Sequence, residues 1–228
     1  MNSFHLTTTR TARYFTLGDP GPDVTDLWIA CHGYGQSAET FLKEFEIIAR
    51  PGRLIVAPEA LSRFYMAAPG APHRKDTPVG GAWMTREDRD AEISDYVAYL
   101  DALVHLLRRQ IAPEATVRAL GFSQGMPTIY RWLALGTEAV DEAILWAGEL
   151  PRDADDAAVK TKLGEAPVSL VAGTNDRYIS PAMFHAFTTR LQRAGLSLRT
   201  LTFDGGHRLD RETLRVLASA SALPVQGL

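Results

Sequence analysis

Thr116–Leu135 reads TVRALGFSQGMPTIYRWLAL, and this stretch decides the fold. Its first residues form a short apolar run typical of a buried strand, and its last ten have the composition of a helix. Between them, Ser123 stands in the pattern G-x-S-x-G, with glycines two positions away on either side. The order strand, tight turn, helix predicts that Ser123 projects from the turn above the end of a strand. The alternative is a glycine-rich turn with a capping serine.

The rest of the chain alternates short β-branched runs with longer helical stretches. Strands are predicted at Arg13–Leu17, Leu27–Cys31, Leu54–Ala57, Thr116–Gly121, Ala143–Trp146, Val168–Ala172 and Leu198–Phe203. Helices are predicted at Ala38–Ala49, Arg86–Gln110, Gln124–Leu135, Ala182–Ala194 and Arg208–Ala218. Strands separated by helices predict one α/β domain over residues 1–228, with a mostly parallel sheet of about seven or eight strands covered on both faces.

Three local features refine this prediction. Thr85 with Asp88 three residues later is a capping-box pattern, which predicts the start of the longest helix. The segment 61–84 is rich in proline and glycine and has no clear periodicity, as in long functional loops. The segment 148–167 holds at most one small helix, so no large cap domain is expected there.

Composition narrows the class of protein. Of 228 residues, 46% are hydrophobic and 22% charged, which is typical of a soluble globular protein. The net charge of −3 and the lack of a basic cluster argue against a nucleic-acid partner. No signal peptide and no long apolar stretch are visible, so we expect no stable membrane insertion. The single cysteine, Cys31, fits a reducing compartment, and a cytoplasmic location is expected.

Polar residues follow two later strands of the predicted sheet. Asp176 comes after the run VSLVA, and His207 comes after LRTLTF, so both belong at the same sheet edge as Ser123. The α/β-hydrolase fold, which this pattern resembles, orders its triad as serine, then acid, then histidine. His207 is therefore the candidate base that activates Ser123, and Asp176 the carboxylate that orients it. Asp204 and Asp210 are weaker candidates for the acid, and Asp176 alone could be a turn residue.

The remaining histidines carry no such context. They are His5, His73, His105 and His185, and surface or core positions are expected for them. Neither H-E-x-x-H nor paired Cys/His spacing occurs, so no metal site is expected.

The run Cys31-His32-Gly33-Tyr34-Gly35-Gln36 follows the predicted strand at 27–31. In the α/β-hydrolase fold this loop supplies one backbone N–H to a developing oxyanion, and the residue after the nucleophile supplies another. We assign these donors to Tyr34 and Gln124. A plain glycine-rich turn is the alternative, and His32 is expected to brace the loop.

Several stretches together resemble the phospholipase/carboxylesterase branch of the α/β-hydrolases, which includes the acyl-protein thioesterases. They are HGYGQ, LIVAPEALSRFY, GGAWMTRED, GFSQG, GTNDRYIS and GGH, between about residues 26 and 209. The resemblance implies a cofactor-free serine hydrolase that cleaves carboxylic esters through an acyl-enzyme. Tyr34 and Gln36 depart from the thioesterase loop H-G-L-G-D, which favours a general carboxylesterase.

Two other functions remain open. The same triad could serve an acyl-thioesterase or a lysophospholipase, and a hydrolase fold can also bind a ligand without catalysis. The partner is expected to be a small ester or thioester, and a homodimer is compatible with the resemblance. Candidate substrate contacts are Trp83, Met84, Phe64 and Tyr65, which could equally pack the 61–84 loop onto the domain. Arg177 could meet an anionic group, although a surface position is expected for it.

Overall fold

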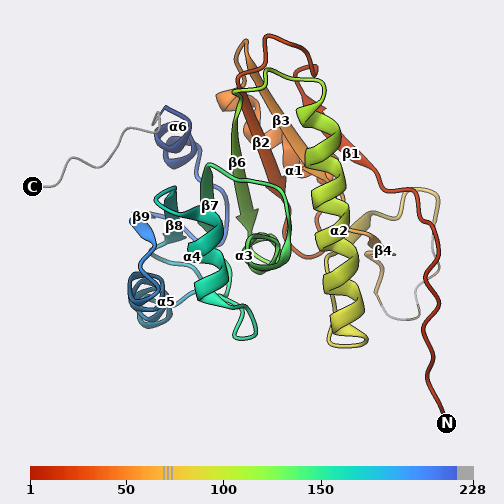
Figure 1. Ribbon diagram of the computed structural model, residues 1–228. Helices are drawn as coiled ribbons and strands as arrows, with labels where there is room; N and C mark the ends of the chain where they lie inside the picture. Colours follow the sequence, from red (N-terminus) through yellow and green to blue (C-terminus); the bar gives the residue numbers. More distant parts are fainter. Residues whose placement is uncertain (69, 71, 73, 220–228) are drawn as a thin grey trace, which may run out of the picture.

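The computed structural model describes residues 1–68, 70, 72 and 74–219. Its centre is a seven-stranded sheet that is parallel except for the first strand (Figure 1). In sheet order the strands are β1 (Tyr14–Leu17), β3 (Arg53–Pro58), β2 (Asp26–Cys31), β6 (Thr116–Phe122), β7 (Glu142–Trp146), β8 (Pro167–Gly173) and β9 (Ser197–Phe203). The predicted α/β fold with a mostly parallel sheet is thereby confirmed.

Helices cover both faces of this sheet, and the sheet divides the hydrophobic core into two layers (Figure 1). One layer lies under α2 (Arg89–Arg108), α3 (Gly125–Leu135), α4 (Asp156–Leu163) and α5 (Pro181–Arg193). The other lies under α1 (Ala38–Leu42), the 3₁₀ helix η1 (Lys43–Ile48) and α6 (Arg211–Ser219). The central strands β2, β3, β6 and β7 are buried along almost their whole length, as their continuous apolar runs predict.

Several helix boundaries differ from prediction; for example, α6 begins at Arg211, three residues after the predicted start. The capping box at Thr85 is wrong, because α2 begins at Arg89 and its N-cap residue, Asp88, has the left-handed φ of 46°. Thr85 instead donates its backbone N–H to the Glu92 carboxylate. The helix expected at 38–49 splits into α1 and η1, with Ser37 capping the start through Thr40 N–H.

The two aperiodic segments contain short elements. Within 61–84, β4 (Ser62–Tyr65) and β5 (Val79–Ala82) pair as an antiparallel hairpin that stands apart from the main sheet. Glycines at two of the four β5 positions conceal this strand in the sequence. Within 148–167, α4 is the one helix, so this part of the chain forms no large cap.

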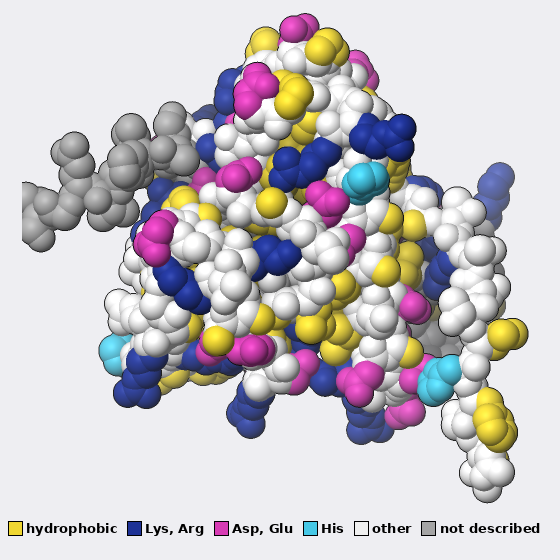
Figure 2. Space-filling model, viewed as in Figure 1, with side chains coloured by type: hydrophobic (Ala, Val, Ile, Leu, Met, Phe, Trp, Pro, Cys, Tyr) yellow, Lys and Arg dark blue, Asp and Glu magenta, His cyan; other side chains and the backbone are white. Residues whose placement is uncertain are grey.

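The surface shows no large patch of a single charge on the visible face, where Lys and Arg alternate with Asp and Glu (Figure 2). In the described part of the chain, no helix is both long and apolar enough to cross a membrane.

Candidate active site

Ser123 occupies a strained turn between β6 and α3. Its φ of 54° lies in the left-handed region, and its N–H donates to Trp146 O of the neighbouring strand at 2.9 Å. Side chains have no room around it: a Cβ on Gly121 or Gly125 would collide with backbone carbonyl groups, and one on Gly148 would collide with Ser123 O. The glycines of the motif are thus required by close packing, and the turn holds the hydroxyl up at the carboxyl ends of the strands.

The three residues predicted to act together are brought together. The Oγ atom of Ser123 lies 2.9 Å from Nε2 of His207, and Nδ1 of His207 lies 2.8 Å from Oδ2 of Asp176. The Asp176 side chain has no exposed surface, and that of His207 is 16% exposed. This geometry lets His207 accept the serine proton while Asp176 fixes the tautomer of the ring.

Backbone contacts hold the acid and the base in place. The second oxygen of Asp176, Oδ1, accepts the N–H groups of Tyr178 at 2.8 Å and Ile179 at 3.2 Å. The β8 loop is tied to the His207 loop, because Asn175 N–H donates to Gly205 O at 2.9 Å. The ring of Tyr178 stands edge-on to His207, with the centroids 4.6 Å apart. Asp176 therefore has one oxygen for the loop and one for the histidine.

The competing acids and histidines lie elsewhere. The Asp204 carboxylate accepts Asn175 Nδ2, and Asp210 caps α6 by accepting Thr213 N–H. The remaining histidines lie on the surface: His5 pairs with Asp88, His105 pairs with Glu138, and His185 is exposed. His73 lies outside the described residues.

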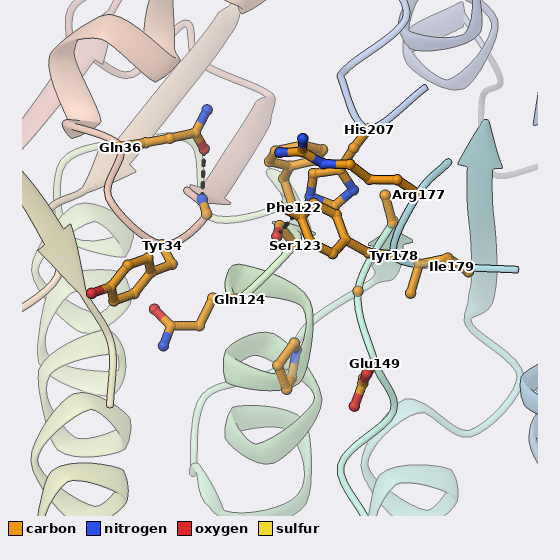
Figure 3. Close-up of a pocket in the computed structure, with 14 residues that line it drawn as sticks. Tyr34, Gln36, Phe122, Ser123, Gln124, Glu149, Arg177, Tyr178, Ile179 and His207 are labelled. Carbon is orange, nitrogen blue, oxygen red and sulfur yellow. Dashed lines mark hydrogen bonds between the residues drawn. The ribbon is translucent and has the colours of Figure 1, made fainter. Parts of the chain in front are cut away.

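The loop after β2 aims one backbone N–H outward. Gly33 O accepts Nδ1–H of His32 at 2.8 Å and Gln36 N–H at 3.2 Å, so this carbonyl points into the loop. Because a trans peptide directs its C=O and N–H to opposite sides, the N–H of Tyr34 points away from it. Within the described residues this N–H has no acceptor, and Tyr34 lines the same cavity as Ser123 (Figure 3).

His32 braces this loop from inside the core, as the sequence predicts. Its Nε2 accepts Ala60 N–H at 3.1 Å, which leaves the proton on Nδ1 for Gly33 O. Burial lowers the pKa of His32, and the ring stays neutral in this role. Cys31 is fully buried beside it, and burial raises the pKa of its thiol, so it offers no reactive thiolate.

The second predicted donor, Gln124, is clamped by its own side chain. Its Oε1 accepts Trp83 N–H at 3.0 Å, and its Nε2 donates to Met84 O at 2.8 Å. The backbone N–H of Gln124, at the start of α3, meets no acceptor in the described part of the chain. Tyr34 and Gln124, whose N–H groups have no acceptor among the described residues, thus line the same cavity as Ser123.

The hairpin β4–β5 supports both of these groups. Gly81 O accepts Gly35 N–H at 2.8 Å, and Gly81 N–H donates to Gln36 O at 3.0 Å. The two residues that follow β5, Trp83 and Met84, hold the Gln124 amide. One short segment therefore fixes the position of both backbone donors.

The cavity above Ser123 has a volume of about 540 Å³. Its wall combines apolar side chains with a few polar ones (Figure 3). The lining residues are Gly33, Tyr34, Gln36, Phe122, Ser123, Gln124, Pro127, Ala147, Gly148, Glu149, Arg177, Tyr178, Ile179 and His207.

The predicted substrate contacts need correction, since none of the four lines this cavity. Trp83 is 2% exposed, and its indole N–H donates to His32 O, so it packs beneath the loop. Met84 packs on the core beside Arg131. Phe64 stacks behind Tyr34 with centroids 5.2 Å apart, and Tyr65 is 51% exposed on the hairpin. The alternative, that these residues pack the loop onto the domain, describes them better.

Other wall residues were missed by sequence reasoning. Phe122 and Tyr178 adjoin residues of the proposed triad, so their proximity could have been read from the motifs. Glu149 comes from the aperiodic segment after β7, where the sequence gives no such signal. Arg177 is exposed, as expected, but it also lines the cavity. The Cζ atom of its guanidinium group lies 4.7 Å from the centroid of the Tyr178 ring.

Among the described residues, no group of three or more His, Cys, Asp or Glu side chains could hold a metal ion.

Comparisons with known proteins identify the family of this chain. Residues 14–221 match the family described as Phospholipase/Carboxylesterase. Esterase PE8 superposes with a TM-score of 0.68 at 20% identity, over 92% of this chain and 97% of that one. Acyl-protein thioesterase 2 of Zea mays gives 0.66 at 16% identity, over 91% and 96%.

A carboxylesterase of Bacillus cereus gives a TM-score of 0.64 at 14% identity, over 91% and 92% of the two chains. No curated protein matches the sequence. At these identities the solved structures show the α/β-hydrolase fold alone, whereas the family match spans nearly the whole chain. The chain belongs to the phospholipase/carboxylesterase family of hydrolases.

Proposed function

We propose that this protein is a serine carboxylesterase that works through an acyl-enzyme on Ser123. The observation that carries the proposal is the connected series Ser123 Oγ, His207, Asp176, with spacings of 2.9 and 2.8 Å, at the floor of an open cavity. The family match supports ester hydrolysis as the reaction class.

In the first half-reaction, Ser123 Oγ attacks the ester carbonyl and His207 Nε2 takes the serine proton. The negative charge that develops on the carbonyl oxygen meets the N–H groups of Tyr34 and Gln124, which have no other acceptor among the described residues. Each such donor contributes on the order of 3–4 kcal/mol to the stability of the transition state. His207 then protonates the alcohol as it leaves.

In the second half-reaction, water takes the place of the alcohol. His207 removes a proton from the water, the hydroxide attacks the acyl-enzyme, and the proton returns to Ser123 as the acid leaves. Asp176 stays ionised throughout and stabilises the imidazolium in both steps.

The cavity wall favours short acyl groups. Phe122, Pro127 and Ile179 provide apolar contact near Ser123, but Glu149 and Arg177 place charges on the same wall. Burying a long alkyl chain against these groups would strip them of water, which is unfavourable without a compensating partner.

The test is hydrolysis of p-nitrophenyl esters from acetate to palmitate by the wild type and by Ser123→Ala. We expect the highest kcat/KM for short chains and a loss of about 10⁴–10⁶-fold in kcat on substitution. Ser94→Ala is the matched control, since Ser94 is exposed on α2 and should leave the rate unchanged. Mass spectrometry of a slowly hydrolysed ester should show the acyl group on the peptide that contains Ser123.

Several outcomes would count against the proposal. Activity that survives Ser123→Ala would remove Ser123 as the nucleophile. Absence of turnover with esters, thioesters and amides would favour a ligand-binding role. Preference for an acyl-thioester over the matched oxygen ester would point to the thioesterase alternative, and preference for palmitate would contradict the assignment of a short acyl pocket.

A further inference from the structure

A second cavity lies at the opposite edge of the sheet, where the parallel strands begin. Its volume is about 410 Å³, and it lies between η1 and α6. Four arginines line it, Arg50, Arg53, Arg118 and Arg215, together with Ser219, and no carboxylate is among its described lining residues. A cavity with this wall attracts anions.

The arginines outnumber the acids that hold them. One carboxylate oxygen of Asp26, Oδ2, accepts hydrogen bonds from the guanidinium groups of Arg50 at 3.0 Å, Arg53 at 2.7 Å and Arg118 at 3.4 Å. These bonds bring the three guanidinium groups together. Including the outer pairs of Glu142 with Arg199 and Glu212 with Arg215, five guanidinium groups share three carboxylates.

The four arginines divide into a fixed floor and a more exposed rim. Arg53 is 3% exposed in its side chain and donates to Ile48 O and Ala218 O as well as to Asp26, so its guanidinium group is held in place at the base of the cavity. Arg118 is 7% exposed. The side chains of Arg50 and Arg215 are each 52% exposed and come from the loop after η1 and from α6, respectively.

The rim arginines have donors for a ligand. A guanidinium has five N–H donors. The bonds seen for Arg215 use one of them, on Glu212, which is itself 74% exposed and so forms a weak pair. Burial, with the neighbouring charges of Arg50 and Arg118, lowers the pKa of Arg53, in keeping with crowding of like charges.

We propose that this cavity binds a phosphate-type oxyanion between Arg50 and Arg215 above the buried Arg53 and Arg118. The oxygens of a phosphate dianion suit the planar fork of arginine, and four such side chains line this cavity. The site is separate from Ser123, since it lies at the amino ends of the strands. Its occupation should stabilise the folded protein, because the ligand binds the folded state alone.

The experiment is a titration of the full chain with inorganic phosphate, followed by calorimetry and by thermal unfolding, against potassium chloride at equal ionic strength. We expect saturable binding and a rise in Tm with phosphate that chloride does not produce. Glycerol phosphate as a second titrant separates the sources: equal affinity assigns the site to phosphate monoesters, and much weaker binding assigns it to the free ion.

Substitutions locate the site. Arg215→Gln should weaken phosphate binding about tenfold, the loss of one charge-assisted hydrogen bond. Arg211→Gln removes a charge from the same helix but not from the cavity wall, and it should leave the affinity unchanged. Arg50→Gln provides a second variant at an exposed position. A response no larger than that to chloride, or equal weakening by Arg211→Gln and Arg215→Gln, would overturn the proposal.

Discussion

The two edges of the central sheet use their polar side chains in opposite ways. At the amino edge, the Asp26 carboxylate accepts from Trp28 Nε1 and from three arginines, so both of its oxygens are used within the protein. At the carboxyl edge, the series from Asp176 to Ser123 ends at a cavity. The comparison teaches that a dense polar network supports the fold, whereas a network left one partner short is available for chemistry.

Among substitutions at the carboxyl edge that should leave the fold intact, we expect the largest loss of activity from Asp176→Asn. The amide oxygen can keep the N–H groups of Tyr178 and Ile179, so its NH₂ then faces His207 Nδ1 and forces the proton onto Nε2. His207 can no longer accept the serine proton, and we expect kcat to fall about 10⁴-fold. Steady-state kinetics and urea unfolding measure the two effects. A kcat close to that of the wild type would remove Asp176 from the proposed triad.

The converse substitution is Asp26→Asn at the amino edge. It leaves several buried guanidinium groups without their shared carboxylate, and we expect the free energy of unfolding to fall by about 3–5 kcal/mol. The kcat of the fraction that remains folded should not change, because Asp26 lies at the far end of β2 from the oxyanion loop. Denaturant titration with an activity assay checks both. A parallel loss of kcat would show that the two edges are coupled.

Gln124→Ala, also at the carboxyl edge, should have an effect of intermediate size on the catalytic rate. It removes the two hydrogen bonds that hold the start of α3 to Trp83 and Met84, each of about 1 kcal/mol. We expect kcat to fall on the order of tenfold with KM nearly constant, since the misplaced N–H acts in the transition state. Gln192→Ala, at an exposed position on α5, is the control. A raised KM at unchanged kcat would instead place the Gln124 side chain in substrate binding.

The smallest effect concerns a carboxylate outside the cavity. A hydrogen bond from Arg131, with a further one from Arg89, holds the pKa of Asp153 well below its usual range. Its folded pKa is depressed, so its stabilisation is complete above the unfolded value near 3.9 and is lost as the pH falls through the folded value.

Asp153→Asn should therefore lower the free energy of unfolding at pH 7 by about 0.5–1 kcal/mol, reduced by partial exposure. The difference from the wild type should shrink as the pH falls below about 4. Urea titrations at pH 7 and pH 3 measure it, and an unchanged difference would mean that the carboxylate charge contributes nothing. The catalytic rate should stay constant.

The sequence predicted the fold well because the core strands are long apolar runs and the turn at Ser123 needs glycines at fixed positions. The helix starts were less predictable: Thr85 fits a capping pattern, but its N–H donates to Glu92 inside α2, and the helix begins after Asp88. The β4–β5 hairpin was missed, because Gly80 and Gly81 have low strand propensity. They are required there by the oxyanion loop, since a Cβ on Gly80 would collide with Gly35.

The site divides in the same way. Ser123, Asp176 and His207 follow strand ends, so topology alone brings them to one edge. The cavity wall depends on where loops return, which periodicity does not encode. Trp83 was a candidate for that wall because it borders the 61–84 loop, yet its indole N–H donates to the buried carbonyl of His32.

The small hairpin has a consequence for motion as well as for position. It is joined to the oxyanion loop by two hydrogen bonds at Gly81 and stands outside the cooperative sheet, so it can open at a lower free energy than the core. Each opening would release both backbone donors at once, and the observed rate scales with the fraction of molecules that are closed. Amide hydrogen exchange at Gly35 and Gly81 would thus measure, before any substrate is added, the fraction of molecules in which the hairpin is closed.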